Sequence, residues 1–123
     1  MVEQAGELPG EAVVVRGGYM RNKSLRISAT THFEESGESE WAWSFWCAPG
    51  KTADEIALDA DFDNDVIRES TVDRIQAAGF EVEADSASDD HCKIKLPGPP
   101  SDEDCKRLRD AFDEARPRPT SGG

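Results

Sequence analysis

The residues of this chain with the clearest capacity for chemistry are aspartates at alternate positions. Asp59, Asp61 and Asp63 occupy the first, third and fifth positions of a segment whose eighth residue is Val66. A calcium loop needs oxygen ligands at such positions, then a tight turn, an apolar anchor and a bidentate glutamate. The turn position here is Asn64, and the twelfth position holds no glutamate. The three aspartates are candidate calcium ligands, and the alternative is an acidic connector that favours the start of a following helix.

Cysteine and histidine offer a second kind of metal chemistry, which the spacing argues against. Cys47, Cys92 and Cys105 include no close pair of the kind that a structural zinc site needs. His91 and Cys92 are adjacent, and neighbours on a strand point to opposite faces of a sheet. An odd number of cysteines and an N-terminus without a secretory signal predict free thiols and a cytoplasmic location. No cofactor is expected.

His32 and His91 are the only histidines, and neither belongs to a recognised nucleophile motif. His91 follows Ala78-Gly79-Phe80 and precedes Leu96-Pro97. This layout resembles the small toxin nucleases of the HicA kind, in which a helix, a Gly-Phe strand and a His-bearing strand form an RNA-binding domain. The resemblance implies that His91 is catalytic. Because that family is basic and this chain is acidic, a surface strand histidine is the alternative.

A further arrangement combines Arg16, at the end of an expected strand, with Ser44 and with Glu81 and Glu83 later in the chain. Their order is similar to the Arg–Ser–Glu layout of ADP-ribosyltransferases, although the Ser-Thr-Ser stretch of that family is missing. The alternative is that Arg16 lies at a strand edge and pairs with a carboxylate.

The charge is strongly negative and unevenly distributed. The formal net charge is -12. Residues 34 to 65 hold ten acidic side chains against one basic residue, and residues 11 to 33 hold four basic residues against one acidic residue. Such a field repels nucleic acid and anionic membranes and attracts basic proteins. The alternative is that the acidity only keeps a small protein soluble.

The elements that must position these residues begin with an aromatic segment, 41–47, which holds all three tryptophans. One side of an extended chain here would carry Trp41, Trp43 and Phe45, and the other side Ala42, Ser44 and Trp46. Both sides are largely apolar, so the segment predicts a strand that is buried on two faces at the centre of a sheet.

Patterning and capping signals predict the remaining elements: a strand over 12–16, a helix over 22–34, helices beginning near 52 and 70, a hairpin of strands over 80–84 and 91–96, and a helix beginning at 101. Residues 22–34 fit a strand as well as a helix. The fold class is α+β, with a small mixed sheet of about four strands, helices mainly on one face and the order β-α-β-α-α-β-β-α. One domain spans 11–115, between a flexible leader (1–10) and a disordered tail (116–123).

The leading functional hypothesis is a small acidic cytoplasmic module that binds a basic protein, as antitoxins, immunity proteins and regulatory proteins do by analogy. Its candidate binding residues are Trp41, Trp46, Glu38, Glu40, Asp54 and Asp59. The alternative is a toxin-type ribonuclease or another hydrolase that uses His91. Nucleic acid and membrane are not expected partners, and the sequence leaves the oligomeric state open.

Overall fold

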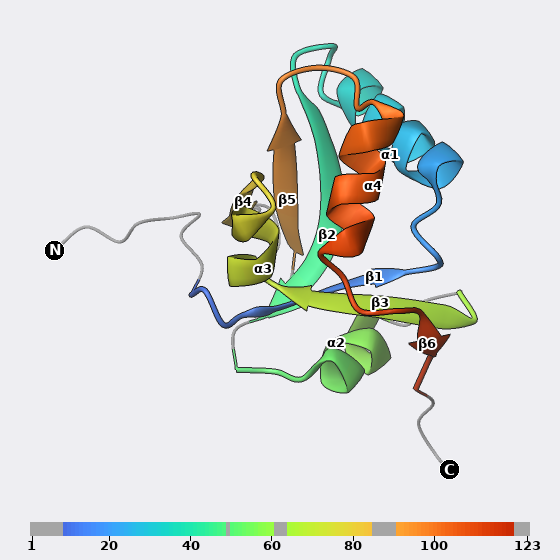
Figure 1. Ribbon diagram of the computed structural model, residues 1–123, viewed down its shortest axis with the longest axis vertical. Coiled ribbons are helices and arrows are strands. Elements are labelled where there is room, and N and C mark those ends of the chain that lie inside the picture. Colours follow the sequence, from blue (N-terminus) through green and yellow to red (C-terminus); the bar gives the residue numbers. More distant parts are fainter. Residues whose placement is uncertain (1–8, 49, 61–63, 85–90, 120–123) are drawn as a thin grey trace, which may run out of the picture.

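The computed structural model describes residues 9–48, 50–60, 64–84 and 91–119 of the 123-residue chain. The elements are β1 (Val13–Gly17), α1 (Asn22–Glu35), β2 (Trp41–Ala48), α2 (Ala53–Ala60), β3 (Val66–Thr71), α3 (Val72–Ala77), β4 (Glu81–Ala84), β5 (His91–Leu96), α4 (Asp102–Asp110) and β6 (Arg116–Pro117). Six strands form one sheet in the order β4-β5-β2-β1-β3-β6 (Figure 1).

The predicted α+β class is confirmed, and the details of the sheet differ from the prediction. The sheet has six strands rather than about four, and every pairing is antiparallel rather than mixed. The predicted order placed two helices in succession, but β3 lies between α2 and α3. Strand β3 begins with β-branched Val66 and Ile67, and it pairs along the full length of β1. These pairings satisfy the amides and carbonyls of β1 that would face solvent if residues 66–71 formed a helix.

The aromatic segment forms β2, which lies between β5 and β1 in the interior of the sheet. Trp43 and Phe45 are fully buried. The indole Nε1 of Trp43 donates to the carbonyl of Leu25 at 2.9 Å. A buried indole N–H needs such a partner, so this bond fixes α1 against the centre of the sheet.

The core has two layers, one on each face of the sheet. On one face, buried residues of α1, α3 and α4 pack around Trp43 and Phe45. On the other face, α2 covers Val15 and Ile67 with Ile56 and two alanines. The expectation of helices mainly on one face is therefore met by three of the four described helices.

Residues 22–34, which fit a helix or a strand equally well, form α1. Leu25 and Ala29 lie one turn apart and are both buried against β2, which decides the matter in favour of the helix. The helix ends at Glu35, and Gly37, two residues later, has a φ of 74° and supplies the left-handed position that commonly closes a helix.

The predicted capping signals place the other helices. Thr52 and Glu55 exchange hydrogen bonds between side chain and backbone at the start of α2. The Ser101 side chain accepts from the amide of Asp104 at the start of α4, and the aspartate accepts in return. Each capping box satisfies two amides that the helix itself leaves without partners. In the described part of the chain no helix combines the length and apolar character needed to cross a bilayer.

Two arginines donate hydrogen bonds to carbonyls of the loop between β1 and α1. Arg68 donates to the carbonyls of Tyr19, Arg109 and Asp113. Arg109 donates to the carbonyl of Met20 at 3.1 Å and also to the side chain of the first α1 residue. Two elements that are distant in the sequence, β3 and α4, thus meet at this loop, and their arginine side chains fix its conformation.

Strand β6 lies in the segment that composition assigned to a disordered tail. Arg116 and Pro117 pair with the start of β3. The Arg116 guanidinium lies 2.9 Å from a carboxylate oxygen of Glu69 and 2.7 Å from one of Asp54. The sheet therefore extends two residues into this segment, where the ion pairs of Arg116 hold the chain against β3 and α2. Residues 1–8 and 120–123, at the ends of the expected leader and tail, lie outside the described residues.

Candidate functional site

Helix α1 carries opposite charges at its two ends. We call Arg21, Lys23 and Arg26 the basic end; all three are exposed around the first turn. We call Glu34, Glu35 and Glu38 the acidic end; all three are exposed at or just beyond the last turn. The helix dipole favours acidic residues at the start of a helix and basic residues at its end. Both ends therefore oppose the dipole, so helix stability does not account for either set.

The backbone at the acidic end holds a glutamate in an uncommon conformation. The amide of Gly37 donates to the carbonyl of Glu34, and the amide of Glu38 donates to the carbonyl of Phe33 at 2.9 Å. In this type of helix end, the residue after the glycine is usually apolar and packs on the helix. Here that residue is Glu38, with a φ of 63°. Left-handed backbone costs a residue with a side chain about 1–2 kcal/mol, and such strain clusters at functional sites.

An aromatic pair adjoins these glutamates. The rings of Phe33 and Trp41 stack with centroids 4.2 Å apart and an interplanar angle of 13°. Both side chains are half-buried, and Trp41 also packs against the core. Aromatic residues surrounded by charged groups are typical of protein interfaces.

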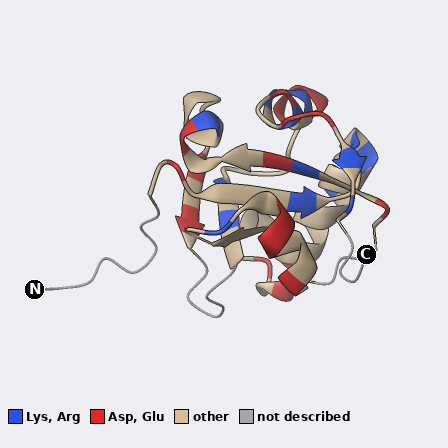
Figure 2. Ribbon diagram, turned by 90° about the horizontal axis from the view of Figure 1, so that it is seen from below, with Lys and Arg blue, Asp and Glu red and all other residues tan. Residues whose placement is uncertain are grey.

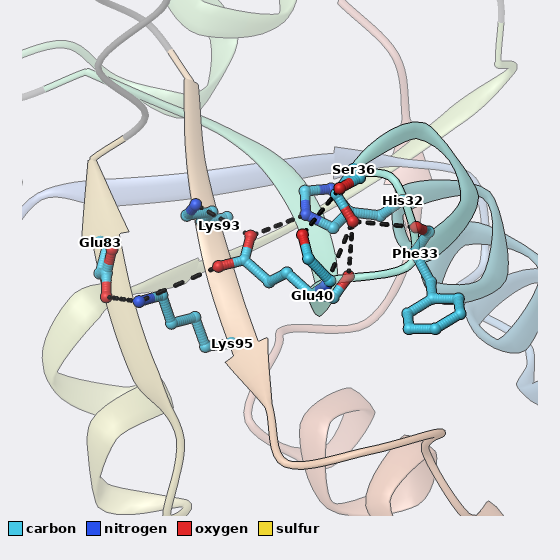
Figure 3. A network of polar contacts seen from close by, with 8 residues as sticks. His32, Phe33, Ser36, Glu40, Glu83, Lys93 and Lys95 are labelled. Carbon is cyan, nitrogen blue, oxygen red and sulfur yellow. Dashed lines mark hydrogen bonds and ion pairs between the residues drawn. The ribbon is translucent and has the colours of Figure 1, made fainter.

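Glu40 fastens the acidic end to strand β5 (Figure 3). Its carboxylate accepts from His32 Nε2 at 2.9 Å and from Lys93 Nζ at 3.0 Å. Lys95 Nζ lies 3.9 Å from the same carboxylate and 2.9 Å from Glu83. The hydrogen bond from His32, followed by that from Lys93, lowers the pKa of Glu40. Glu40 is therefore engaged within the protein, unlike Glu38.

The two other acidic candidates lie on α2, across the sheet from α1. Asp54 pairs with Arg116 at 2.7 Å, and Asp59 pairs with Lys51 at 2.8 Å. The acidic run of residues 34 to 65 is thus divided between two helices that cover opposite faces. Acidic and basic segments also occur together on several helices and strands in Figure 2.

His91 and Trp46 are neighbours on adjacent strands. Their ring centroids are 4.0 Å apart. Cys92, next to His91, is buried on the opposite face. Across the described ranges, His91 makes no hydrogen bond to a carboxylate or a nucleophile, and Asp89 and Asp90 lie outside those ranges. The described surroundings of His91 thus consist of an aromatic ring rather than a catalytic partner.

The metal hypothesis can be followed only in part. Asp59 lies on α2, whereas Asp61 and Asp63 lie outside the described residues. Within the part of the chain that the structure describes, no group of three or more His, Cys, Asp or Glu side chains is arranged to hold a metal ion. The three cysteines are buried free thiols.

Sequence reasoning missed a hollow of about 350 Å³ at the end of β1. Arg16, Ser24, Ser44, Trp46 and Asn64 are among the residues that line it. Arg16 Nη1 donates to the carbonyl of Ser44 at 2.9 Å. The predicted pairing of Arg16 with a carboxylate is not found among the described residues. Arg16 and Ser44 do meet, but Glu81 and Glu83, on β4, do not line the hollow.

The signal for this hollow in the sequence was the segment that follows β1, where Gly17 and Gly18 come directly after Arg16. A turn explains those glycines, so the sequence alone gave no reason to place a hollow there. No family model, curated protein or solved structure matches the chain. Functional inference therefore depends on the geometry of the two ends of α1.

Proposed function

We propose that this protein is a non-enzymatic interaction module that binds a basic protein partner at the acidic end of α1. The observation that carries the proposal is the half-exposed Phe33–Trp41 pair beside glutamates that form no ion pair within the described residues. An aromatic anchor would supply much of the affinity, and the surrounding charge would select the partner and speed the encounter.

Two properties of the whole chain support this proposal. The net charge of -12 provides long-range attraction for a basic protein before contact. The three free, buried cysteines suit a reducing cytoplasm, where disulfides are rare. An antitoxin, immunity or regulatory protein would combine these properties.

The alternative, hydrolysis by His91, receives less support from the geometry. A catalytic histidine needs a positioned partner within hydrogen-bond reach. Within the described residues, the His91 ring lies against the Trp46 ring at an interplanar angle of 54°. Cleavage of RNA by the wild type that disappears in His91→Ala would restore this alternative.

The test is affinity capture from native cytosol with wild-type protein and the variant Glu34→Gln/Glu38→Gln. We expect wild type to retain a basic protein, and the variant to retain at least about tenfold less, since two desolvated charge contacts together contribute on the order of 1.4 kcal/mol or more. Raising the salt concentration should release the partner, because the Debye length shortens to about 3 Å at 1 M.

The matched control is Glu81→Gln/Glu103→Gln, which removes the same charge from exposed glutamates on β4 and α4. Capture by this control should equal that by wild type. Equal losses in both variants would show that only net charge matters, and capture that is indifferent to salt would contradict the proposal.

A further inference from the structure

We propose that the hollow beside Arg16 binds a small phosphate-bearing metabolite at the basic end of α1. This site is separate from the acidic end and does not depend on the function proposed above. The argument combines the charge in the hollow, its hydrogen-bond donors, the rigidity of its loop and its size.

The charge in the hollow is positive and lacks a counter-ion among the described residues. The guanidinium of Arg16 lies 5.3 Å from the centroid of the Phe45 ring and donates one hydrogen bond, to a neutral carbonyl. Burial lowers the pKa of Arg16 to about 10. Arg16 is half-buried. Even partial burial of a cation without a paired anion is unfavourable, so an anion in the hollow would relieve it.

The donors in the hollow outnumber the oxygens of a carboxylate. Ser24, Ser44 and Asn64, each of which carries a hydrogen-bond donor, line it together with Arg16. These three polar side chains make no hydrogen bond to other described residues. A phosphate group offers three strong acceptor oxygens and accepts two parallel bonds from arginine.

The start of α1 adds backbone donors on the same side. The first helical hydrogen bond is donated by the Leu25 amide, so the amides of Asn22 to Ser24 have no partner inside the helix. The N-cap residue, Arg21, gives no side-chain cap, and the first turn contains no acidic residue. Helix starts of this kind favour phosphate through their amides and dipole. Ser24 belongs to this turn and also lines the hollow, which joins the two features.

The loop that forms one wall is fixed in advance. Gly18 and Met20 have φ of 91° and 59°, and Met20 is almost fully buried. Arg68 and Arg109 hold the carbonyls of Tyr19 and Met20 from behind, at 3.1 Å each. A wall that is already ordered spends little binding free energy on loop ordering, which favours ligand affinity.

The size of the hollow favours a small ligand. Its volume of about 350 Å³ lies at the lower end of the range for sites that enclose small molecules, roughly 300–1,000 Å³. Trp46 contributes an aromatic wall, which could contact the rest of a phosphomonoester. The free phosphate ion and a small phosphomonoester share the chemistry that Arg16 recognises, and the experiment separates them.

The test titrates the full chain with inorganic phosphate, glycerol 3-phosphate and acetate at matched ionic strength. Backbone NMR shifts of Gly17, Gly18 and Ser24 report binding in the hollow of the wild-type protein. We expect both phosphates to shift these amides and acetate to bind at least about tenfold more weakly, given the missing charged hydrogen bonds. Tighter binding of glycerol 3-phosphate identifies an ester as the ligand, and equal binding identifies the free ion.

The variant Arg16→Gln should weaken phosphate affinity by about tenfold to hundredfold, the effect of losing a charged donor. Its matched control is Arg107→Gln, which removes an exposed arginine on α4 that lies over the Phe80 ring and does not line the hollow; it should change affinity less than about threefold. Should Arg16→Gln fail to fold, Ser24→Ala tests the same wall. Unshifted amides, equal losses in both arginine variants or acetate that binds as well as phosphate would each overturn the proposal.

Discussion

The two ends of α1 manage their charge in different ways. At the basic end, Arg26 pairs with Asp102 and Arg21 lies over the Tyr19 ring at 5.0 Å, beside the hollow. At the acidic end, the described glutamates form no ion pairs, and Glu38 is held with a left-handed backbone. Both ends oppose the helix dipole. The comparison shows that one helix can carry two surfaces of opposite charge, neither of which stabilises the helix itself.

The largest expected effect comes from a substitution that weakens the packing of α1 on the sheet, on which both ends of the helix depend. Leu25 is fully buried, and its carbonyl accepts from Trp43. Leu25→Ala should lower the free energy of unfolding by about 3 kcal/mol, the middle of the range for buried leucine, and weaken binding at both ends together. Urea unfolding followed by circular dichroism measures this change.

The control for this prediction is Ile27→Ala on the same helix, where the side chain is 55% exposed. It should change stability by less than about 0.5 kcal/mol. A similar loss in both variants would mean that α1 is not anchored through Leu25, and the shared support of the two ends would be disproved.

A smaller effect tests whether the acidic end opposes the helix dipole. Glu34→Gln/Glu35→Gln should raise the free energy of unfolding by about 1 kcal/mol at low salt, because each glutamate lies at the negative end of α1. Thermal unfolding at several salt concentrations should show the gain shrinking as salt rises.

Glu103→Gln provides a control of opposite sign, because Glu103 lies in the first turn of α4, where the dipole favours it. That variant should lose a few tenths of a kcal/mol, within the range for exposed helix ends of roughly 0.3–1 kcal/mol. Stabilisation by both variants would indicate relief of net charge and would remove the dipole from the comparison.

The smallest expected effect tests whether Glu40, unlike Glu38, stabilises the fold through its bonds to His32 and Lys93. The folded protein lowers the pKa of Glu40 below its ordinary value of 4.5. The stability that ionised Glu40 contributes to the folded protein is therefore complete above pH 4.5 and is lost as the pH falls through the lowered pKa. Wild type should exceed Glu40→Gln by about 0.5 kcal/mol at neutral pH, a value typical of partly exposed pairs. Denaturant unfolding from pH 7 downwards should show this difference closing below pH 4.5, and a constant difference would contradict it.

Much of the fold follows from local patterns in the sequence. The alternation in β2, the capping pairs at Thr52 and Ser101, and the hairpin of β4 and β5 are each set by residues close together in the chain. Such local signals survive because packing agrees with them.

Strand β3 was not predicted because its apolar and polar residues do not alternate along the chain. Ile67 is buried under α2, while Arg68 and Glu69 follow it at half-exposed positions. Ser70, only 2% exposed, is satisfied by donating to the carbonyl of Ala111 at 2.6 Å. A polar residue buried by a distant partner gives no strand signal in the sequence.

The candidate sites show the same limit. Glu38 and Trp41 were predicted as binding residues, and the structure places both beside Phe33. The hollow was not predicted, because Arg16, Ser44 and Asn64 come from three separate segments. Only the antiparallel pairings of β1 bring them together.

Strand β6 has a consequence beyond its length of two residues. It covers part of the outer side of β3, a side that would otherwise present unpaired amides and carbonyls. Arg116 is held there by ion pairs with Glu69 and Asp54, and Pro117 has no backbone N–H that could donate to a further strand. This short segment therefore occupies part of the β3 edge and keeps it from pairing with an edge strand of another copy.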